Sequence, residues 1–288
     1  MEKTKLRLIH IHGCRGIGWK SIHKFLKFDS SLQTIFTLKE QHFPPLFQMT
    51  EKNSKLFLAD LHSKTIGQVL EHHLKYNITP LTIFDNEYPD ILRQIYDPPW
   101  VLYIKGKKSL LKSNCMSVVG TRNPSPYGFK ALERILPPLI HNKWTIVSGL
   151  AHGIDTAAHT VTIEEKGYTI AVLGSGFNQI YPTQNKTLAT EIAQNHLLLS
   201  EFSPDRKAEK WHFPLRNRII SGLSKGTLII EAKERSGSLI TAEQALEQGR
   251  EVFAVPGSIF EDRNHGTNRL IQQGAKLVLH AEDIMNEL

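Results

Sequence analysis

Residues 116–155 read MSVVGTRNPSPYGFKALERILPPLIHNKWTIVSGLAHGID. A short apolar run at 116–119 ends in GTR (120–122), and a second apolar run at 144–147 ends in SG (148–149). Each run is followed by a polar loop and then by the apolar spacing of a helix. Two strand–loop–helix units in succession predict an α/β fold, in which a mostly parallel sheet carries helices on both faces.

Both glycine-containing loops are expected at the carboxyl edge of this sheet, where doubly wound folds bind ligands. A glycine lets backbone amides approach a phosphate, and the start of a helix adds partial positive charge. Arg122 adds a permanent cation with five donors in a fixed geometry. The stretch therefore indicates a ligand that carries phosphate groups.

The same pattern continues to the end of the chain. Further strands are expected at 168–173, 196–200, 227–230, 251–255 and 277–279, which gives about seven strand–helix units with small residues at most strand ends. One element breaks the pattern, because Pro137-Pro138 falls inside the helix expected at 127–141. Since an interior proline costs a helix about 3 kcal/mol, we expect this helix to end or kink near Leu136.

Composition indicates an ordinary globular protein, with 288 residues of which 40% are hydrophobic and 22% charged. No apolar run approaches the roughly 20 residues that cross a bilayer, and the N-terminus lacks a signal-peptide core. The two cysteines lack metal spacing and are expected to be reduced, which predicts a cytoplasmic protein. His152 and His159 have no third ligand spaced to join them, so no metal site is expected.

Charge is uneven along the chain. Residues 1–112 hold 17 Lys and Arg against 10 Asp and Glu, whereas residues 113–288 hold 18 of each. A basic segment favours an anionic partner such as nucleic acid, although a solvated basic face would look the same.

Residues 5–28 read as helix, glycine-rich turn and helix, similar to a helix-hairpin-helix or sterile-alpha-motif unit. Such a unit could pack as a small bundle, or its turn amides and Lys20, Lys24 and Lys27 could meet a DNA backbone. We expect a small helical domain at 1–75 and an extended Rossmann-like DNA-binding domain at 76–288.

From about residue 80 onward the chain resembles the DNA-processing protein A (DprA, or Smf) family. The resemblance rests on a series of motifs in one order, namely GTR (120–122), SGLAHGID (148–155), GSG (174–176), the YP step (181–182), SE (200–201), FPLRNRIISGLS (213–224), SGSLITA (236–242), GREVFAVPG (249–257) and GTNRLIQQGA (266–275). The N-terminal part resembles that family's small helical domain only loosely.

The resemblance implies a non-enzymatic protein that binds single-stranded DNA taken up in natural transformation, protects it and loads the RecA recombinase onto it. It also implies a homodimer formed by roughly the last 60 residues. No cofactor, no catalytic residue and no C-terminal winged helix are expected. The residues expected to bind DNA phosphates are Gly120, Thr121, Arg122, Ser148, Gly149, Gly174, Gly176, Lys186, Arg216, Asn217, Arg218, Ser236 and Gly237.

Other functions remain open from the residues alone. A nicotinamide site is disfavoured because Gln179 stands where the dinucleotide fingerprint needs its third glycine. A Rossmann-like phosphoribohydrolase would also present glycine loops to a nucleotide, but the PGSIFEDRNHGTNR segment (256–269) lacks the acidic arrangement of those enzymes. A third possibility is a dimeric interaction protein that binds DNA only incidentally. The RNR triplet beside Trp211, His212 and Phe213 combines cations with aromatic rings, which suits single-stranded nucleic acid.

Overall fold

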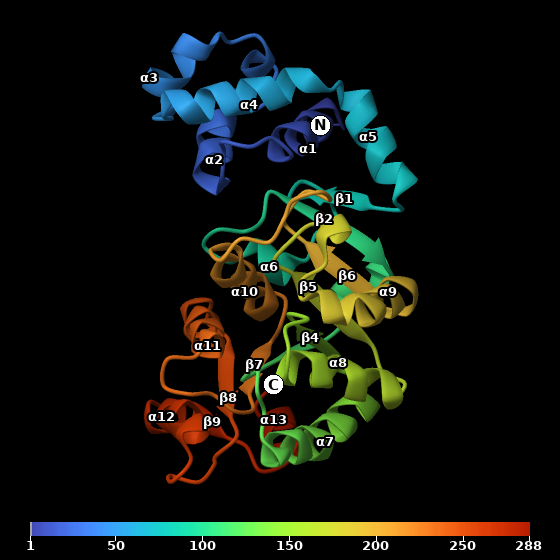
Figure 1. Ribbon diagram of the computed structural model, residues 1–288, viewed down its shortest axis with the longest axis vertical. Coiled ribbons are helices and arrows are strands. Elements are labelled where there is room, and N and C mark those ends of the chain that lie inside the picture. The colour runs from blue at the N-terminus through green and yellow to red at the C-terminus, as the bar shows by residue number, and fades with distance from the viewer. Residues whose placement is uncertain (1) are drawn as a thin grey trace. The chain divides into compact units, whose positions relative to one another are not determined.

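The computed structural model describes residues 2–288. The chain divides into two compact units, which are the N-terminal unit (Met1–Tyr88 and Asp97–Ile104) and the sheet unit (Pro89–Tyr96 and Lys105–Leu288). Figure 1 shows helices in the first and alternating strands and helices in the second. In residues 2–288 we find no helix that is both long enough and apolar enough to cross a membrane.

The N-terminal unit is a helical bundle with a pair of antiparallel strands. Four mutually packed phenylalanines form its core, since Phe25 has its ring centroid 4.6 Å from Phe47 and 5.4 Å from Phe57, with Phe43 beside all three. The predicted helix–turn–helix at 5–28 is confirmed. The helices are α1 (Glu2–His12), α2 (Trp19–Phe28), α3 (Phe43–Phe47), α4 (Glu51–Ser63) and α5 (Ile66–Lys75), and β1 (Thr79–Thr82) pairs antiparallel with β2 (Val101–Gly106).

The sheet unit contains a parallel sheet in the order β6-β5-β4-β3-β7-β8-β9. Its core strands are nearly continuous apolar runs, as expected for strands covered on both faces. The predicted mostly parallel α/β sheet is therefore confirmed. The strands are β3 (Cys115–Val119), β4 (Thr145–Ser148), β5 (Thr169–Leu173), β6 (Leu197–Ser200), β7 (Gly226–Ile229), β8 (Glu251–Ala254) and β9 (Lys276–Leu277).

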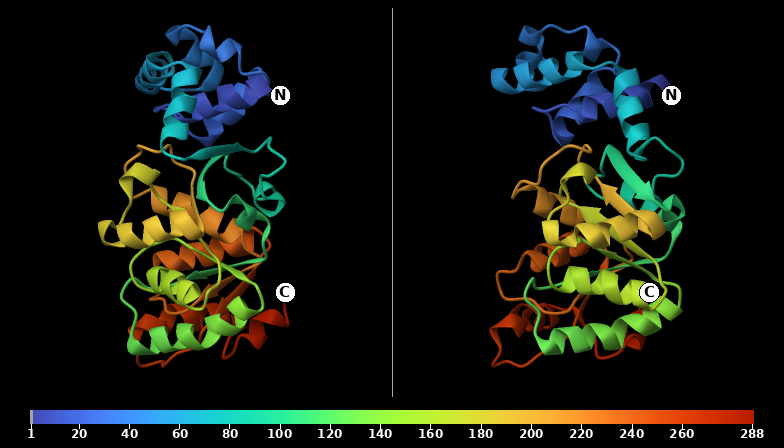
Figure 2. Two further views of the ribbon diagram at one scale, coloured as in Figure 1. Left: turned by 90° about the vertical axis from the view of Figure 1, so that its right-hand side faces the viewer. Right: turned by 45° about the vertical axis from the view of Figure 1, so that its right-hand side comes forward.

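Helices cover both faces of this sheet. Met116 and Val118 of β3 pack in one buried cluster with Leu132 and Ile135 of α7 and Ala158 of α8, while α10 packs against α11. Figures 1 and 2 place the α7–α8 pair (green) and the α10–α11 pair (orange) on opposite sides of the strands. The helices are α6 (Asp90–Arg93), α7 (Pro126–His141), α8 (Ile154–Glu164), α9 (Lys186–Asn195), α10 (His212–Gly222), α11 (Gly237–Glu247), α12 (His265–Gln272) and α13 (Glu282–Met285).

The prolines in α7 do not end it. The helix continues to His141, so the end predicted near Leu136 is wrong. Pro137 and Pro138 each lack an N–H, but the carbonyls that those groups would meet belong to Glu133 and Arg134, whose side chains are exposed to water. Asn142 then closes the helix, because its backbone amide and Nδ2 both donate to the Pro138 carbonyl, at 3.1 and 2.9 Å.

Buried histidines make the fold sensitive to acid. Burial lowers the pKa of His159 to about 3, and His159 lies 2.6 Å from the Thr169 hydroxyl through Nδ1. Burial also lowers the pKa values of His10, His196 and His212. An unfolded histidine takes up a proton near pH 6.5, so these groups favour unfolding as the pH falls below that value.

We expect the free energy of unfolding to fall between pH 6.5 and pH 5, with His159 alone contributing about 1.4 kcal/mol per pH unit. Denaturant unfolding at a series of pH values would measure this slope. The variant His159→Asn should unfold with a shallower slope than the unmodified chain. Equal slopes in the two proteins would contradict the assignment to His159.

Candidate nucleic-acid interface

A cavity of about 530 Å³ opens at the carboxyl ends of β3 and β7. The strand order reverses here, since the chain proceeds from β3 toward β6 on one side and from β7 toward β9 on the other. Such a switch point separates the loops that follow neighbouring strands and leaves a crevice for ligands. The residues around the cavity are Val119, Gly120, Arg122, Ala151, Asp155, Tyr181, Lys210, Phe213, Pro214, Arg216, Asn217, Ser236, Gly237, Ser238, Ile240 and Thr241.

The loop that carries Arg122 is fixed by its neighbours. The Thr121 amide donates to the Glu231 carbonyl at 2.7 Å, and the Ile154 amide donates to the Thr121 carbonyl at 3.2 Å. Gly153 has a φ of +77°, and a Cβ at this position would lie 2.4 Å from the Thr121 oxygen. Only glycine therefore allows the loop after β4 to pass so close to the loop after β3.

Glu231 also holds this loop through its side chain. The carboxylate is fully buried, and it accepts hydrogen bonds from the Ser125 amide at 2.8 Å and from the Ser125 hydroxyl. Ser125 is the N-cap of α7, and a Cβ at Gly128 would lie 2.5 Å from the Glu231 Oε2. Glu231 thus fixes both ends of the segment that presents Arg122.

The variant Glu231→Gln should weaken this support. An amide nitrogen would replace one of two accepting oxygens and leave a Ser125 donor or the new amide unpaired, at a cost of about 1–3 kcal/mol. We expect a lower melting temperature together with weaker binding of single-stranded DNA. Glu234→Gln, at an exposed position three residues further along, is the matched control. Unchanged melting and binding in Glu231→Gln would contradict the role of this carboxylate.

Arg216 forms the floor of the cavity. Its side chain is buried, and Nη1 donates to the Val172 carbonyl at 2.7 Å. Burial lowers its pKa to about 10, against the opposing effect of Asp155, so the guanidinium stays charged at neutral pH. A Cβ at Gly149 would lie 1.7 Å from Nη1, and a side chain at 149 would displace the guanidinium.

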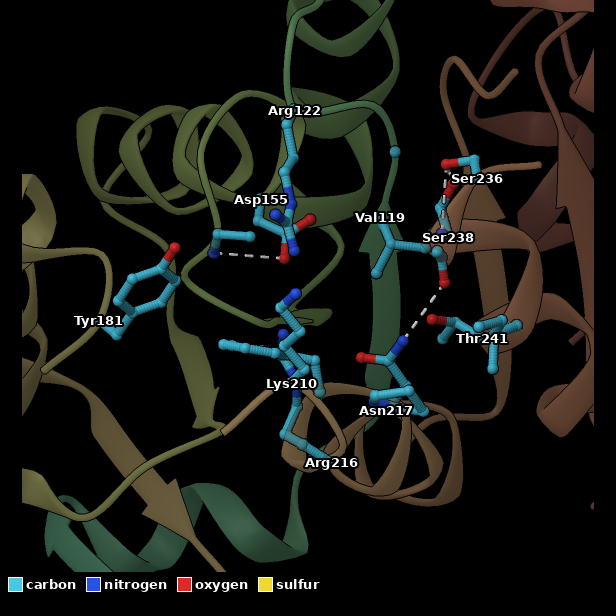
Figure 3. Close-up of a pocket in the computed structure, with 16 residues that line it drawn as sticks. Val119, Arg122, Asp155, Tyr181, Lys210, Arg216, Asn217, Ser236, Ser238 and Thr241 are labelled. Atoms are coloured by element: carbon cyan, nitrogen blue, oxygen red, sulfur yellow. Dashed lines mark hydrogen bonds between the residues drawn. The ribbon is translucent and has the colours of Figure 1, made fainter. Parts of the chain in front are cut away.

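Asp155 faces the cations. Its Oδ2 accepts from the amides of Gly149 and Ala151, at 3.1 and 3.4 Å. Gly153 is the N-cap of α8, so Asp155 does not cap the helix and instead braces the loop in front of it. Burial raises the pKa of Asp155, while the nearby Arg216 lowers it. Figure 3 shows the side chains of Arg122, Lys210 and Arg216 converging on this carboxylate.

Aromatic rings complete the wall. The Phe213 and Tyr181 ring centroids are 5.6 Å apart, and Cζ of Arg122 lies 5.9 Å from the Phe213 ring. The cavity thus presents three basic side chains, one carboxylate and two rings. This combination suits a polyanion that carries planar groups. In residues 2–288 no cluster of three His, Cys, Asp or Glu side chains could hold a metal ion.

Comparison with known proteins identifies the family. Residues 79–288 match the family described as DNA recombination-mediator protein A. The chain belongs to this family. DNA processing protein DprA of Bacillus subtilis (strain 168) is 51% identical over 224 residues, which cover 77% of this chain and 75% of that protein.

Two solved structures of family members resemble this one. DNA processing protein A from Streptococcus pneumoniae has a TM-score of 0.82 at 39% identity, over 98% of this chain and 96% of that chain. DNA processing protein A from Helicobacter pylori has a TM-score of 0.66 at 32% identity, over 73% of this chain and 94% of that chain, and its structure concerns a single-stranded DNA binding mode.

The structure gathers about half of the expected phosphate-binding residues around the cavity. Six of them line it, namely Gly120, Arg122, Arg216, Asn217, Ser236 and Gly237. Asn217 joins two sides of the cavity, because its Nδ2 donates to the Gly237 carbonyl at 3.3 Å. Ser236 caps α11 by accepting from the Ser238 amide. The family motifs thus meet at one place although they are far apart in the sequence.

The other expected residues lie behind the cavity wall or away from it. Thr121 and Gly149 shape its loops, and the Ser148 hydroxyl donates to the Val118 carbonyl at 2.6 Å. Lys186 is exposed at the first residue of α9. Arg218 is buried in an ion pair with Glu201 at 2.6 Å. The RNR triplet lies in the second turn of α10.

Most of the glycines serve protein packing. A Cβ at Gly120 would meet Ile154 at 2.7 Å, one at Gly174 would meet Phe213 at 3.0 Å, and one at Gly176 would meet Ser203 at 2.1 Å. Gly237 is different, because no atom lies within 4 Å of its ideal Cβ. The start of α11 is therefore the glycine loop that leaves open space for a ligand.

The set predicted from the sequence lacks Asp155, Tyr181 and Lys210, which also line the cavity. Tyr181 follows the third glycine turn, and Lys210 precedes the WHF segment. Both positions carry a ring or a charge beside a predicted motif, which is the signal that could have found them.

Proposed function

We propose that this protein binds single-stranded DNA through the switch-point cavity and acts as a recombination mediator without catalysing a reaction. The proposal rests on one observation above all, which is that Arg122, Lys210 and Arg216 share a cavity with the Phe213 and Tyr181 rings. Cations that follow a phosphate backbone and flat surfaces that receive bases are the two requirements of sequence-tolerant single-strand binding.

Each group has a part in this proposal. Arg122 and Lys210 are exposed and donate to backbone phosphates. The buried Arg216 is a positive charge in a fixed position, which attracts the phosphates electrostatically. Bases stack on Phe213 and Tyr181. The open space at Gly237 lets the DNA backbone approach the start of α11. These contacts recognise phosphates and ring faces, so they require no base sequence.

The proposed biological role is supported by the family to which the chain belongs. We propose that the protein protects DNA entering the cell in natural transformation and loads RecA onto it, as a homodimer joined through the last 60 or so residues. The 51% identity to DNA processing protein DprA of Bacillus subtilis and the Helicobacter pylori structure with its single-stranded DNA binding mode support this role.

A salt titration of binding to oligothymidylate tests the proposal. Several phosphate contacts should give a log–log slope of about −0.7 for each contact on a single strand. The absence of binding at low salt would refute it. Incubation with nucleoside monophosphates then tests the phosphoribohydrolase alternative, for which release of free base at a catalytic rate is the expected result.

A further inference from the structure

A second cavity of about 530 Å³ lies within the N-terminal unit, apart from the motifs of the family. The second half of α2 contributes His23, Leu26 and Lys27 to its lining, and Phe84 and Trp100 line it as well. This volume falls in the range of small-molecule sites, about 300–1,000 Å³, and suits a ligand of a few rings.

Two lining rings of this cavity, His23 and Trp100, are packed against Trp19, which lies behind them. The Trp19 ring stacks on His23 at 5.2 Å with 11° between planes, and on Trp100 at 5.4 Å with 26° between planes. Both indoles are fixed by hydrogen bonds, because Trp19 Nε1 donates to the Pro98 carbonyl at 2.7 Å and Trp100 Nε1 donates to the Trp19 carbonyl at 3.0 Å. A planar ligand would therefore meet an aromatic surface that is already in place.

Lys27 gives the cavity its charge. It is exposed, and no carboxylate is among the lining residues. Lys24, three residues earlier, donates to the Phe47 carbonyl at 3.0 Å and to Gln48 at 2.6 Å, whereas we find no hydrogen-bond or ion-pair partner for Lys27 in residues 2–288. One uncommitted cation beside a flat aromatic wall matches a nucleotide, whose base stacks while its phosphate meets the charge.

The glycine-rich turn between α1 and α2 does not provide this site. Gly16 has a φ of +79°, and a Cβ there would lie 2.3 Å from the Asn53 carbonyl. The turn is thus packed against α4. Gly16 therefore leaves no room for a ligand beside α4, whereas the cavity at the end of α2 does.

We propose that this cavity is a second contact for single-stranded DNA, which receives one base against the lining rings of Phe84 and His23 and one phosphate at Lys27. The proposal rests on the function proposed above. The described part of the N-terminal unit holds 12 Lys and Arg against 9 Asp and Glu, an excess of three positive charges. This charge favours an anionic ligand, but it does not distinguish a nucleic acid from an acidic peptide. The planar wall selects a nucleobase over a peptide side chain.

Photo-crosslinking of the full chain to oligothymidylate that contains 5-bromodeoxyuridine tests this directly, with mass spectrometry to locate the crosslinks. Crosslinks at His23, Phe84 or Trp100 are expected in addition to those at Tyr181 and Phe213. Crosslinks at the switch-point cavity alone, or none in a protein that binds DNA, would overturn this proposal and leave the proposed function intact. A protein that binds no DNA at low salt would overturn both.

Affinity gives an independent readout. We expect Lys27→Ala and Phe84→Ala each to weaken binding to long oligothymidylate about three- to tenfold, because one phosphate contact or one stacked base is lost. Lys20→Ala removes an exposed lysine from the same helix outside the cavity and is the matched control. Equal losses in Lys20→Ala and Lys27→Ala would overturn the site.

Discussion

Replacing Arg122 with alanine should lower the affinity for oligothymidylate about 10- to 100-fold, since a hydrogen bond to a charged group contributes about 1.5–3 kcal/mol. The side chain is exposed at the cavity, and its loop is held by the Glu231 carbonyl and by the loop after β4. The fixed backbone of the loop keeps the Arg122 side chain at the cavity, so its removal takes away a contact that no neighbouring residue replaces. The neighbouring Phe213 ring also loses its cation partner.

The salt dependence identifies the lost contact. The log–log slope in Arg122→Ala should be less steep by about 0.7, the value for one phosphate on a single strand. Arg134→Ala is the matched control, because Arg134 is an exposed arginine of α7 that does not line the cavity. Equal losses in Arg122→Ala and Lys27→Ala would show that the main contact is not at the switch point.

Removing Glu201 should destabilise the fold by about 3 kcal/mol, because the buried Arg218 guanidinium loses the carboxylate that accepts two of its hydrogen bonds. Arg218 Nη2 donates to both carboxylate oxygens of Glu201 at 2.6 Å, and the two side chains are 4% and 9% exposed. The pair joins the end of β6 to α10, which carries Arg216 and Phe213. Denaturant unfolding of Glu201→Ala measures the loss.

Two further variants test whether the loss of stability in Glu201→Ala comes from the buried charge of Arg218. Glu209→Ala removes an exposed carboxylate that pairs with Arg206, and it should change stability by less than about 1 kcal/mol. The double variant Glu201→Leu with Arg218→Met removes both charges and should recover most of the lost stability. A double variant as unstable as Glu201→Ala would contradict the explanation by the loss of this buried ion pair.

The fold was accessible from the sequence because its strands are short apolar runs that end in small residues. The strands at 115–119, 145–148 and 169–173 lie within one or two residues of the expected positions. Right-handed strand–helix–strand connections then leave few ways to order a parallel sheet. The end that was one of the two outcomes expected near Leu136 did not occur, because the cost of an interior proline depends on its surroundings in the folded chain, and a sequence does not show these.

The site was only partly accessible for a related reason. Motifs reveal which residues gather at a sheet edge, but not which way each side chain points. Arg216 and Arg218 stand two residues apart in one triplet, yet one lines the cavity and the other pairs with Glu201 behind it. Glycines were read as openings for phosphate, whereas Gly149 makes room for the Arg216 guanidinium. Such distinctions arise from packing between distant segments.

The walls of the switch-point cavity come from segments that span residues 119–241, with β3 at the centre of the sheet. During synthesis, Arg122 leaves the ribosome long before Ser236 and the start of α11. A nascent chain that has exposed only the loop after β3 therefore lacks most of the cavity that binds DNA. DNA-binding competence should therefore arise abruptly, once α11 has emerged and β7 has docked beside β3. Truncated chains that end before α11 should therefore not bind DNA at the switch-point cavity.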